Sequence, residues 1–298
     1  MNTGSKLACA VVVYIASCGY AAPAATATVD EPTADAPVQV IDGDYGYGLP
    51  PDVSVNGHEI DELITVLHGF MIVLFVGWGI FLLTCLIRFR RSAGYRAVHE
   101  AVKAKPAKYI EIGVVGFEGV LLLGFSIPIW GNVKNNIPAQ SEAPVRVHVL
   151  AEQFNWNFHY PGPDQVFGRT APEHINPAAN PIGLDPNDPK GEDDIVSGVL
   201  RIPVGRPVIC ELSSKDVIHS FFIPVMRIKQ DTIPGMRIPV WFEAKTTGTY
   251  QVACAQLCGN NHYSMKALMV IETPDEFEAW LAAQNAPPEE FDEDEFED

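Results

Sequence analysis

The chain has 298 residues, 47% of them hydrophobic, and a formal net charge of −17 at pH 7. So large an apolar fraction can bury a core and excludes disorder throughout. Lys and Arg total 20 against 37 Asp and Glu, which excludes a nucleic-acid binder that relies on bulk charge. Six cysteines are too few for a disulfide scaffold of this length.

The first residues have the pattern of a secretory signal. A basic residue precedes an apolar run, and residues 15–18 (IASC) match a lipobox, in which Cys18 becomes the lipidated N-terminus. Cleavage after residues 25–27 (ATA), with Cys18 discarded, is the alternative. Either way residues 1–17 are predicted to be a signal peptide. Residues 18–59 are then a flexible external segment, rich in Ala, Pro, Asp and Gly over most of its length.

Two apolar segments predict a transmembrane hairpin over residues 60–135. Residues 64–87 are almost uninterrupted apolar sequence, long enough to cross about 30 Å of hydrocarbon. The second span, 110–130, contains Glu111 and Glu118, and a buried helix of a water-soluble protein is its alternative. The loop 88–108 between the spans carries seven Lys and Arg against one acid, whereas no Lys or Arg precedes the first span after the signal. The positive-inside rule therefore places this loop in the cytoplasm and both termini outside.

The remainder of the chain reads as a β domain, residues 136–284, followed by an acidic tail, residues 285–298. About seven short strands favour a β-sandwich or barrel. The segment 161–194, rich in Pro, Asn, Asp and Gly, predicts a long surface loop, and residues 274–284 predict a short helix. The predicted strands are 145–150, 198–202, 207–212, 220–224, 238–243, 249–253 and 267–271.

Soft metal ligands gather directly after a predicted strand. Cys254, Cys258, His262 and Met265 fall within twelve residues, and His219 lies upstream. Soft thiolates select copper or zinc, and a thioether suits copper. The two cysteines, four residues apart in a loop, can bridge a metal pair with one histidine at each end. Met265 and a backbone carbonyl can then act as weak axial ligands.

Other readings of these residues remain open. A disulfide between Cys254 and Cys258 is one alternative outside the membrane. A Cys₂His₂ zinc site would use the same cysteines and histidines. A mononuclear blue-copper site needs one cysteine, so the second argues against it. Cys210 stands apart in an apolar run and is expected in the core.

The hairpin, the β domain and the motif C-x-x-x-C-x-x-x-H-x-x-M preceded by D-V-I-H resemble subunit II of the haem–copper cytochrome c oxidases. Residues 126–128 (SIP) and 229–235 (KQDTIPG) match the family as well. The resemblance implies a membrane α plus all-β protein, in which a two-helix hairpin precedes a cupredoxin-like Greek-key β-barrel. That barrel holds the dinuclear copper centre called CuA.

The resemblance also implies roles for the ligand residues. The family has Glu where this chain has Gln256, and the glutamate side chain also reaches a magnesium ion. A neutral amide is a poorer ligand for a hard cation, so we expect this magnesium site to be weakened or empty. The implied copper ligands are the bridging Cys254 and Cys258, the imidazoles of His219 and His262, the axial Met265 and the carbonyl oxygen of Gln256.

Further residues take family roles by position. Phe154 stands where the family has the Trp that faces cytochrome c, and Trp156 matches a second Trp of the family motif. The alternative for both residues is that they only pack in the core of the barrel. Asp216 is a candidate steering charge for a basic c-type cytochrome. Glu111 matches a Glu at the mouth of a proton pathway, with interfacial solvation as its alternative. Glu118, costly inside a membrane, is expected to face the main subunit.

The resemblance implies subunit II of a terminal respiratory oxidase in a bacterial plasma membrane, with the copper domain on the periplasmic side. It would take electrons from a c-type cytochrome and pass them to the haem–copper subunit I, which reduces oxygen to water and pumps protons. Subunit III and membrane lipid are further expected partners, and nucleic acid is not. The remaining histidines are scattered, so the oxygen site is expected on another chain. The alternative is a CuA-containing accessory subunit of a nitric oxide reductase or other electron-transfer complex.

Overall fold

The computed structural model describes residues 49–90, 94, 96, 99 and 105–285. The chain divides into two compact units, residues 1–37 and 38–298, and all described residues belong to the second. The predicted signal peptide, Cys18, part of the basic loop and the acidic tail after residue 285 lie outside the described residues.

Two long apolar helical segments precede the β domain. Helix α1 spans Gly57–Arg88, and α2 (Lys105–Leu121) continues through a wide π-helical turn, η3 (Leu122–Ser126), into α3 (Ile127–Asn135). Pro128 has no N–H, and its ring would clash with the carbonyl one turn earlier, which accounts for the wide turn just before it. Both segments are long and apolar enough to cross a membrane, and almost none of either is buried.

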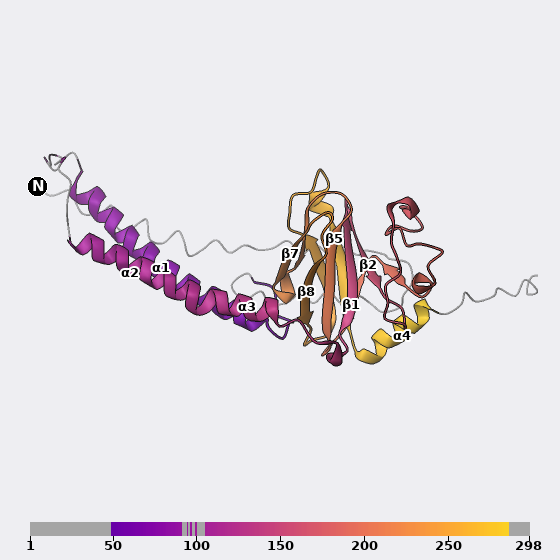
Figure 1. The fold of residues 1–298 in the computed structure, drawn as a ribbon. Coiled ribbons are helices and arrows are strands. Elements are labelled where there is room, and N and C mark those ends of the chain that lie inside the picture. The colour runs from indigo at the N-terminus through magenta and orange to yellow at the C-terminus, as the bar shows by residue number, and fades with distance from the viewer. Residues whose placement is uncertain (1–48, 91–93, 95, 97–98, 100–104, 286–298) are drawn as a thin grey trace, which may run out of the picture. The chain divides into compact units, whose positions relative to one another are not determined.

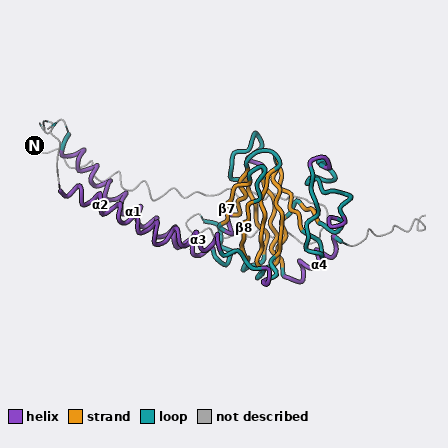
Figure 2. The backbone as a smooth tube through the Cα atoms, in the orientation of Figure 1, coloured by secondary structure: helices purple, strands orange, loops and turns teal. Residues whose placement is uncertain are grey.

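Two five-stranded sheets form the β domain (Figures 1 and 2). Strand β1 pairs in parallel with β5, and β4 with β10, while the other pairs are antiparallel. In spatial order the first sheet is β3 (Ile195–Ser197), β2 (Asn155–Tyr160), β1 (Val145–Glu152), β5 (Pro207–Ser214) and β8 (Ile238–Glu243). The second is β4 (Leu200–Pro203), β10 (Lys266–Glu272), β9 (Gly248–Cys254), β6 (His219–Ile223) and β7 (Ile228–Thr232). The predicted fold class, two apolar helices before a cupredoxin-like β domain, is confirmed.

All seven predicted strands are present, but β2, β3 and β7 were missed. Strand β2 is buried on both faces, so it lacks the alternation that marks a half-buried strand. Strand β7 lies at a sheet edge and carries Lys229, Gln230 and Asp231 in its middle. The segment 161–194 contains no strand; two short 3₁₀ turns, Pro172–His174 and Pro189–Gly191, punctuate it.

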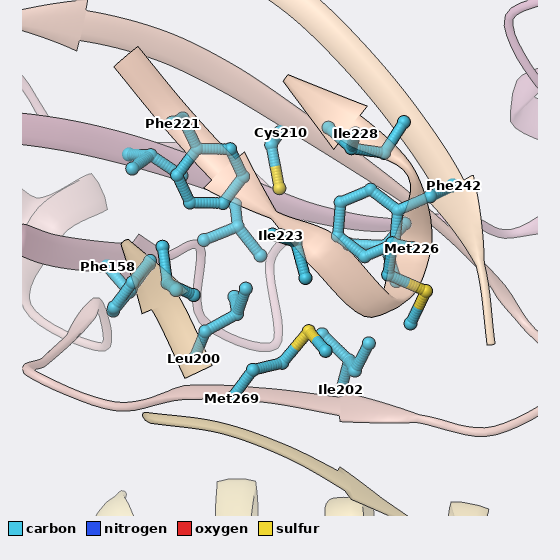
Figure 3. Packing of buried hydrophobic residues seen from close by; sticks show 14 of the residues in the cluster. Phe158, Leu200, Ile202, Cys210, Phe221, Ile223, Met226, Ile228, Phe242 and Met269 are labelled. Carbon is cyan, nitrogen blue, oxygen red and sulfur yellow. The ribbon is translucent and has the colours of Figure 1, made fainter. Parts of the chain in front are cut away.

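The core lies between the two sheets (Figure 3). Phe158, Cys210 and Phe242 come from the first sheet, and they pack with side chains of the second sheet such as Phe221 and Met269. Cys210 is fully buried, and burial raises the pKa of its thiol well above the usual range. The sequence prediction of a core cysteine is therefore confirmed.

Helix α4 (Pro274–Gln284) closes the described chain with the predicted bounds. It begins with a capping box, in which Thr273 and Glu276 satisfy each other's backbone N–H groups. The ring of Trp280 lies 5.2 Å from that of Tyr160, so the helix packs against β2.

The segment before α1 is bound to the β domain. The Val53 N–H donates to the Val225 carbonyl and the Val55 N–H to the Glu243 carbonyl, both at 3.0 Å. The guanidinium of Arg227 donates to both carboxylate oxygens of Asp61, at 2.7 and 2.8 Å. Residues 53–61 are thus held in place, although the sequence predicted a flexible segment as far as residue 59.

Candidate metal centre

The candidate ligands meet at one end of the second sheet. Strand β6 begins at His219, β9 ends at Cys254, and β10 begins directly after Met265. Cys254 pairs with Phe221, which lies two residues along β6 from His219 and therefore on the same face. Antiparallel pairing thus brings His219 to the loop of residues 254–265, although 35 positions separate it from Cys254.

The donor atoms of these residues lie within a few ångströms of one another. The two cysteine sulfurs are 3.8 Å apart, and both thiols are free. Nδ1 of His262 lies 3.6 Å from the Cys258 sulfur, while Nδ1 of His219 lies 4.0 Å from the Cys254 sulfur and 3.2 Å from that of Met265. The Met265 sulfur is also 3.8 Å from the Cys258 sulfur.

The backbone supplies one further acceptor. The carbonyl oxygen of Gln256 lies 3.2 Å from the Cys254 sulfur, while the residue itself is exposed. All six residues singled out by their chemistry and by the family resemblance are therefore brought together. His219 lies beside Met265 and Cys254, and His262 lies beside Cys258.

This donor set fits soft metal ions. The ligand atoms of His219, Cys254 and Cys258 all lie within 4.8 Å of one another, and these residues form a group that could hold a metal. Thiolate and imidazole suit copper and zinc alike, but the buried Met265 thioether suits copper. A tetrahedral Cys₂His₂ zinc site would leave that sulfur unused.

The environment of Cys258 disfavours its thiolate form when no cation is bound. Burial, together with the neighbouring Cys254 thiol, raises the pKa of Cys258 to about 11. The Cys258 thiol therefore resists ionisation until a cation compensates its charge.

Asp216 orients His219. It accepts a hydrogen bond from His219 Nε2 at 2.8 Å, which leaves Nδ1 facing the sulfurs. Burial opposes ionisation of Asp216, but hydrogen bonds from His219 and from the Gln153 and Val217 N–H groups hold its pKa below the usual range. Asp216, predicted as a steering charge, is thus engaged with a candidate ligand.

The turn between β1 and β2 covers the 254–265 loop. Gln153 Nε2 donates to the Cys258 carbonyl at 2.6 Å. Gly259, at φ +141°, lies so close beneath that a Cβ there would be 2.9 Å from Gln153 Nε2 and 3.0 Å from the Phe154 ring. Sequence reasoning missed Gln153 and Gly259; their only signals were their places next to Phe154 and Cys258.

The aromatic residues of this region differ in exposure. Phe154 is half-buried and packs against the core at the edge of the site. Trp156 is fully buried, with its ring 6.2 Å from that of His219 and 5.5 Å from that of Phe221. A donor protein could therefore touch Phe154 but not Trp156. Leu257 and Tyr263, each beside a candidate ligand, are 79% and 86% exposed.

The two acidic residues of the second span are not part of this cluster. Glu111 and Glu118 lie on α2, seven residues apart and therefore on one helix face. Both are exposed, and neither has a hydrogen-bond or ion-pair partner among the described residues.

The chain matches a protein-family model over residues 188–273, that of the cytochrome C oxidase subunit II periplasmic domain. This range contains every candidate metal ligand. The matched region therefore contains the whole candidate metal centre of the β domain.

Several known proteins are similar over most of the chain. "Alternative cytochrome c oxidase subunit 2" of Bradyrhizobium diazoefficiens is 33% identical over 235 residues, 78% of this chain and 82% of the relative. Cytochrome c oxidase subunit 2 of Thermostichus vulcanus is 31% identical, covering 82% of this chain and 65% of the relative. A solved periplasmic domain of subunit II of Bradyrhizobium japonicum cytochrome oxidase shares 24% identity with a TM-score of 0.37, over 50% of this chain and 96% of that chain. By its similarity to the Bradyrhizobium diazoefficiens protein, this chain belongs to the cytochrome c oxidase subunit II family.

Proposed function

We propose that this chain receives electrons for a terminal respiratory oxidase at a dinuclear copper centre of the CuA type. The observation that carries the proposal is the convergence of two cysteine sulfurs, two histidine Nδ1 atoms, a thioether and a carbonyl oxygen at one end of the barrel. The thiolates of Cys254 and Cys258 and the imidazoles of His219 and His262 would hold the copper pair. The Met265 thioether and the Gln256 carbonyl would supply its weaker ligands.

When bound, the copper pair supplies a site that takes up and releases one electron with little change in geometry. The protein residues hold the ligands in place for this purpose. Asp216 accepts the Nε2–H of His219 and thereby fixes which ring nitrogen faces the site. The fully buried Trp156 packs beside that histidine, and the fully buried Phe221 packs against Trp156, so water is excluded from this side. A dry, preorganised site keeps the rearrangement that accompanies electron transfer small.

The electron donor is proposed to be a c-type cytochrome that docks beside Phe154. This residue is half-buried, packs at Gly259 in the ligand loop and is reachable from solvent. Phe154→Ala should therefore slow electron transfer from reduced cytochrome c while the copper content stays unchanged. An unchanged rate would contradict this role for Phe154.

The electrons would leave for subunit I, which carries the oxygen-reducing site, with subunit III as a further partner. The hairpin is proposed to cross the plasma membrane twice with the β domain on the periplasmic side, as the basic 88–108 loop indicates. Glu111 and Glu118 share one exposed face of α2, which is therefore the proposed contact with subunit I and its proton pathway. Cys18 is the proposed lipid anchor, and the magnesium site is proposed to be weak because Gln256 presents an amide.

The test is to purify the complex from its native membrane and identify the large subunit that accompanies this chain. We expect a haem–copper subunit I, oxygen consumption with reduced cytochrome c, and a mixed-valence copper signal in electron paramagnetic resonance. Loss of that signal in Cys258→Ser would assign it to this chain. Reduction of nitric oxide without oxygen consumption would contradict the oxidase function. A complex without copper would contradict the copper assignment.

A further inference from the structure

The turn between β1 and β2 touches the candidate metal centre from outside its ligand set. Gln153 is the central residue of this contact. Its side-chain amide donates to the carbonyl of Cys258, and its backbone N–H donates at 2.7 Å to Oδ2 of Asp216. Asp216 in turn accepts the Nε2–H of His219. Gln153 therefore connects one bridging cysteine with the histidine at the other side of the site.

The space around Gln153 is shaped for this contact. The ligand loop passes so close beneath the turn that a Cβ at position 259 would come within 2.9 Å of the Gln153 amide and displace it. The positive φ of Gly259 disfavours any other residue as well. The missing Cβ leaves room for the Gln153 amide, and a 2.6 Å hydrogen bond holds this amide against the Cys258 carbonyl.

We propose that Gln153 is a positioning residue that sets the reduction potential of the copper centre through the carbonyl of Cys258. This inference rests on the proposed function. The side-chain N–H of Gln153 compensates the negative end of the Cys258 carbonyl dipole. This carbonyl lies close to the site, because Cys258 also supplies a bridging sulfur. Without the donor, that negative end is uncompensated and favours the more positive, oxidised state of the site. Loss of the donor therefore lowers the midpoint potential.

The same contact constrains the geometry of the site. With Gln153 in place, the Cys258 backbone and the Asp216 carboxylate are tied to one residue, so the bridging sulfur and the His219 ring keep a fixed relation. Without the Gln153 amide, the loop loses its side-chain hydrogen bond to the turn between β1 and β2. The distribution of the unpaired electron over the two coppers should then become less even.

The experiment uses the purified oxidase complex containing the full chain. Gln153→Met keeps the side-chain length but has no donor, and Gln153→Glu keeps the shape but presents oxygen to the carbonyl. Gln251→Met is the matched control, because Gln251 is exposed on β9, the strand that leads into Cys254. Copper content, potentiometric titration of the copper signal and its hyperfine pattern are measured for each.

Both Gln153 variants should bind copper at the wild-type ratio with a lowered midpoint potential and an altered hyperfine pattern. The downward shift should be larger for Gln153→Glu, since its carboxylate adds negative charge, while Gln251→Met should match the wild type. Gly259→Ala, which displaces the amide from the other side, should lower the potential as well and add little to Gln153→Met in the double variant.

Wild-type potential and hyperfine pattern in Gln153→Met would overturn the proposal. So would reduced copper occupancy with an unchanged signal from the remaining copper, because that result identifies a purely structural role. If the wild-type complex itself lacked a copper signal, the proposed function would fail rather than this inference.

Discussion

The ion pair between Asp61 and Arg227 should control how tightly the start of α1 is held on the β domain. The Arg227 side chain is 8% exposed and donates to both Asp61 oxygens and to the carbonyls of Pro50 and Pro224. Hydrogen bonding to Asp61 raises the pKa of Arg227. Asp61→Asn removes the charge and turns one acceptor into a donor that faces the guanidinium. A charge-assisted hydrogen bond contributes about 1.5–3 kcal/mol, and partial exposure of Asp61 places the loss near 2 kcal/mol.

A loss of about 2 kcal/mol corresponds to a roughly 30-fold increase in local opening. Hydrogen exchange measured by mass spectrometry should detect it at the Val53 and Val55 amides, which donate to β-domain carbonyls. Glu278→Gln is the control, because it breaks an exposed pair with Arg206 elsewhere on the domain. If exchange of residues 49–60 in Asp61→Asn equals that of the wild type, the pair does not hold this segment.

The conformation of Arg227 gives an independent check on the same contact. Its φ of +57° is left-handed, which costs a non-glycine residue about 1–2 kcal/mol. Arg227→Ala loses the pair and keeps the strain, whereas Arg227→Gly loses the pair and relieves the strain. The glycine variant should therefore open less than the alanine variant in the same exchange measurement. Equal opening would show that the strain is absent.

Changes at three further residues test the site and the core. Met265→Leu keeps the volume of a buried side chain but removes the thioether that lies 3.2 Å from His219 Nδ1. We expect this variant to bind the full amount of copper with a raised midpoint potential. An unchanged midpoint potential would argue against axial ligation by Met265. Burial, with Arg237 and His159, lowers the pKa of His148 to about 4, while the unfolded chain takes up the proton near 6.5. The free energy of unfolding should thus fall by about 3 kcal/mol as the pH drops from 6.5 to 4. In His148→Gln the thermal midpoint should depend less on pH over this range. A variant whose midpoint changes with pH as steeply as that of the wild type would contradict this role of His148. Trp156→Phe should lower the free energy of unfolding by about 1–2 kcal/mol, because the Trp156 Nε1 has no hydrogen-bond partner among the described residues. Trp156→Ala should lower it by about 3–5 kcal/mol, because it leaves a cavity. Equal shifts of the thermal midpoint in the two variants would contradict cavity formation as the cause.

The fold could be predicted from the sequence where burial leaves a local pattern. The membrane spans are long apolar runs, and the start of α4 is indicated by Thr273, Pro274 and Glu276 in capping positions. Strand β2 could not be found this way, because both of its faces are covered and polar residues such as Asn157 and His159 lie inside. Nε2 of His159 contacts the buried carboxylate of Asp194 there at 2.6 Å, 35 residues further along the chain. Sequence spacing does not reveal such a partner.

The candidate ligands could be predicted because metal chemistry restricts the residue types. Cysteine, histidine and methionine at this spacing have few other uses, so their positions alone indicated the site. The contact of Gln153 could not be predicted from the sequence, because Gln153 donates to a backbone carbonyl and every residue has one. The role of Gly259 follows from the turn that lies over it, which is visible only once β1 and β2 are folded beside the loop.

The net charge of −17 does not describe the surface that a donor would meet at the metal centre. Residues 254–265 contain no Asp, Glu, Lys or Arg, and Leu257 and Tyr263 are the exposed large hydrophobic side chains of this loop. Asp216 is occupied with His219, so Asp216→Asn would change ligand orientation together with charge. Steering is better tested at exposed acids of the 161–194 loop, such as Asp164 and Glu173. Long-range steering by charges is sensitive to ionic strength. If Asp164→Asn and Glu173→Gln leave the salt dependence of cytochrome c oxidation unchanged, docking depends instead on apolar contacts such as those of Leu257 and Tyr263.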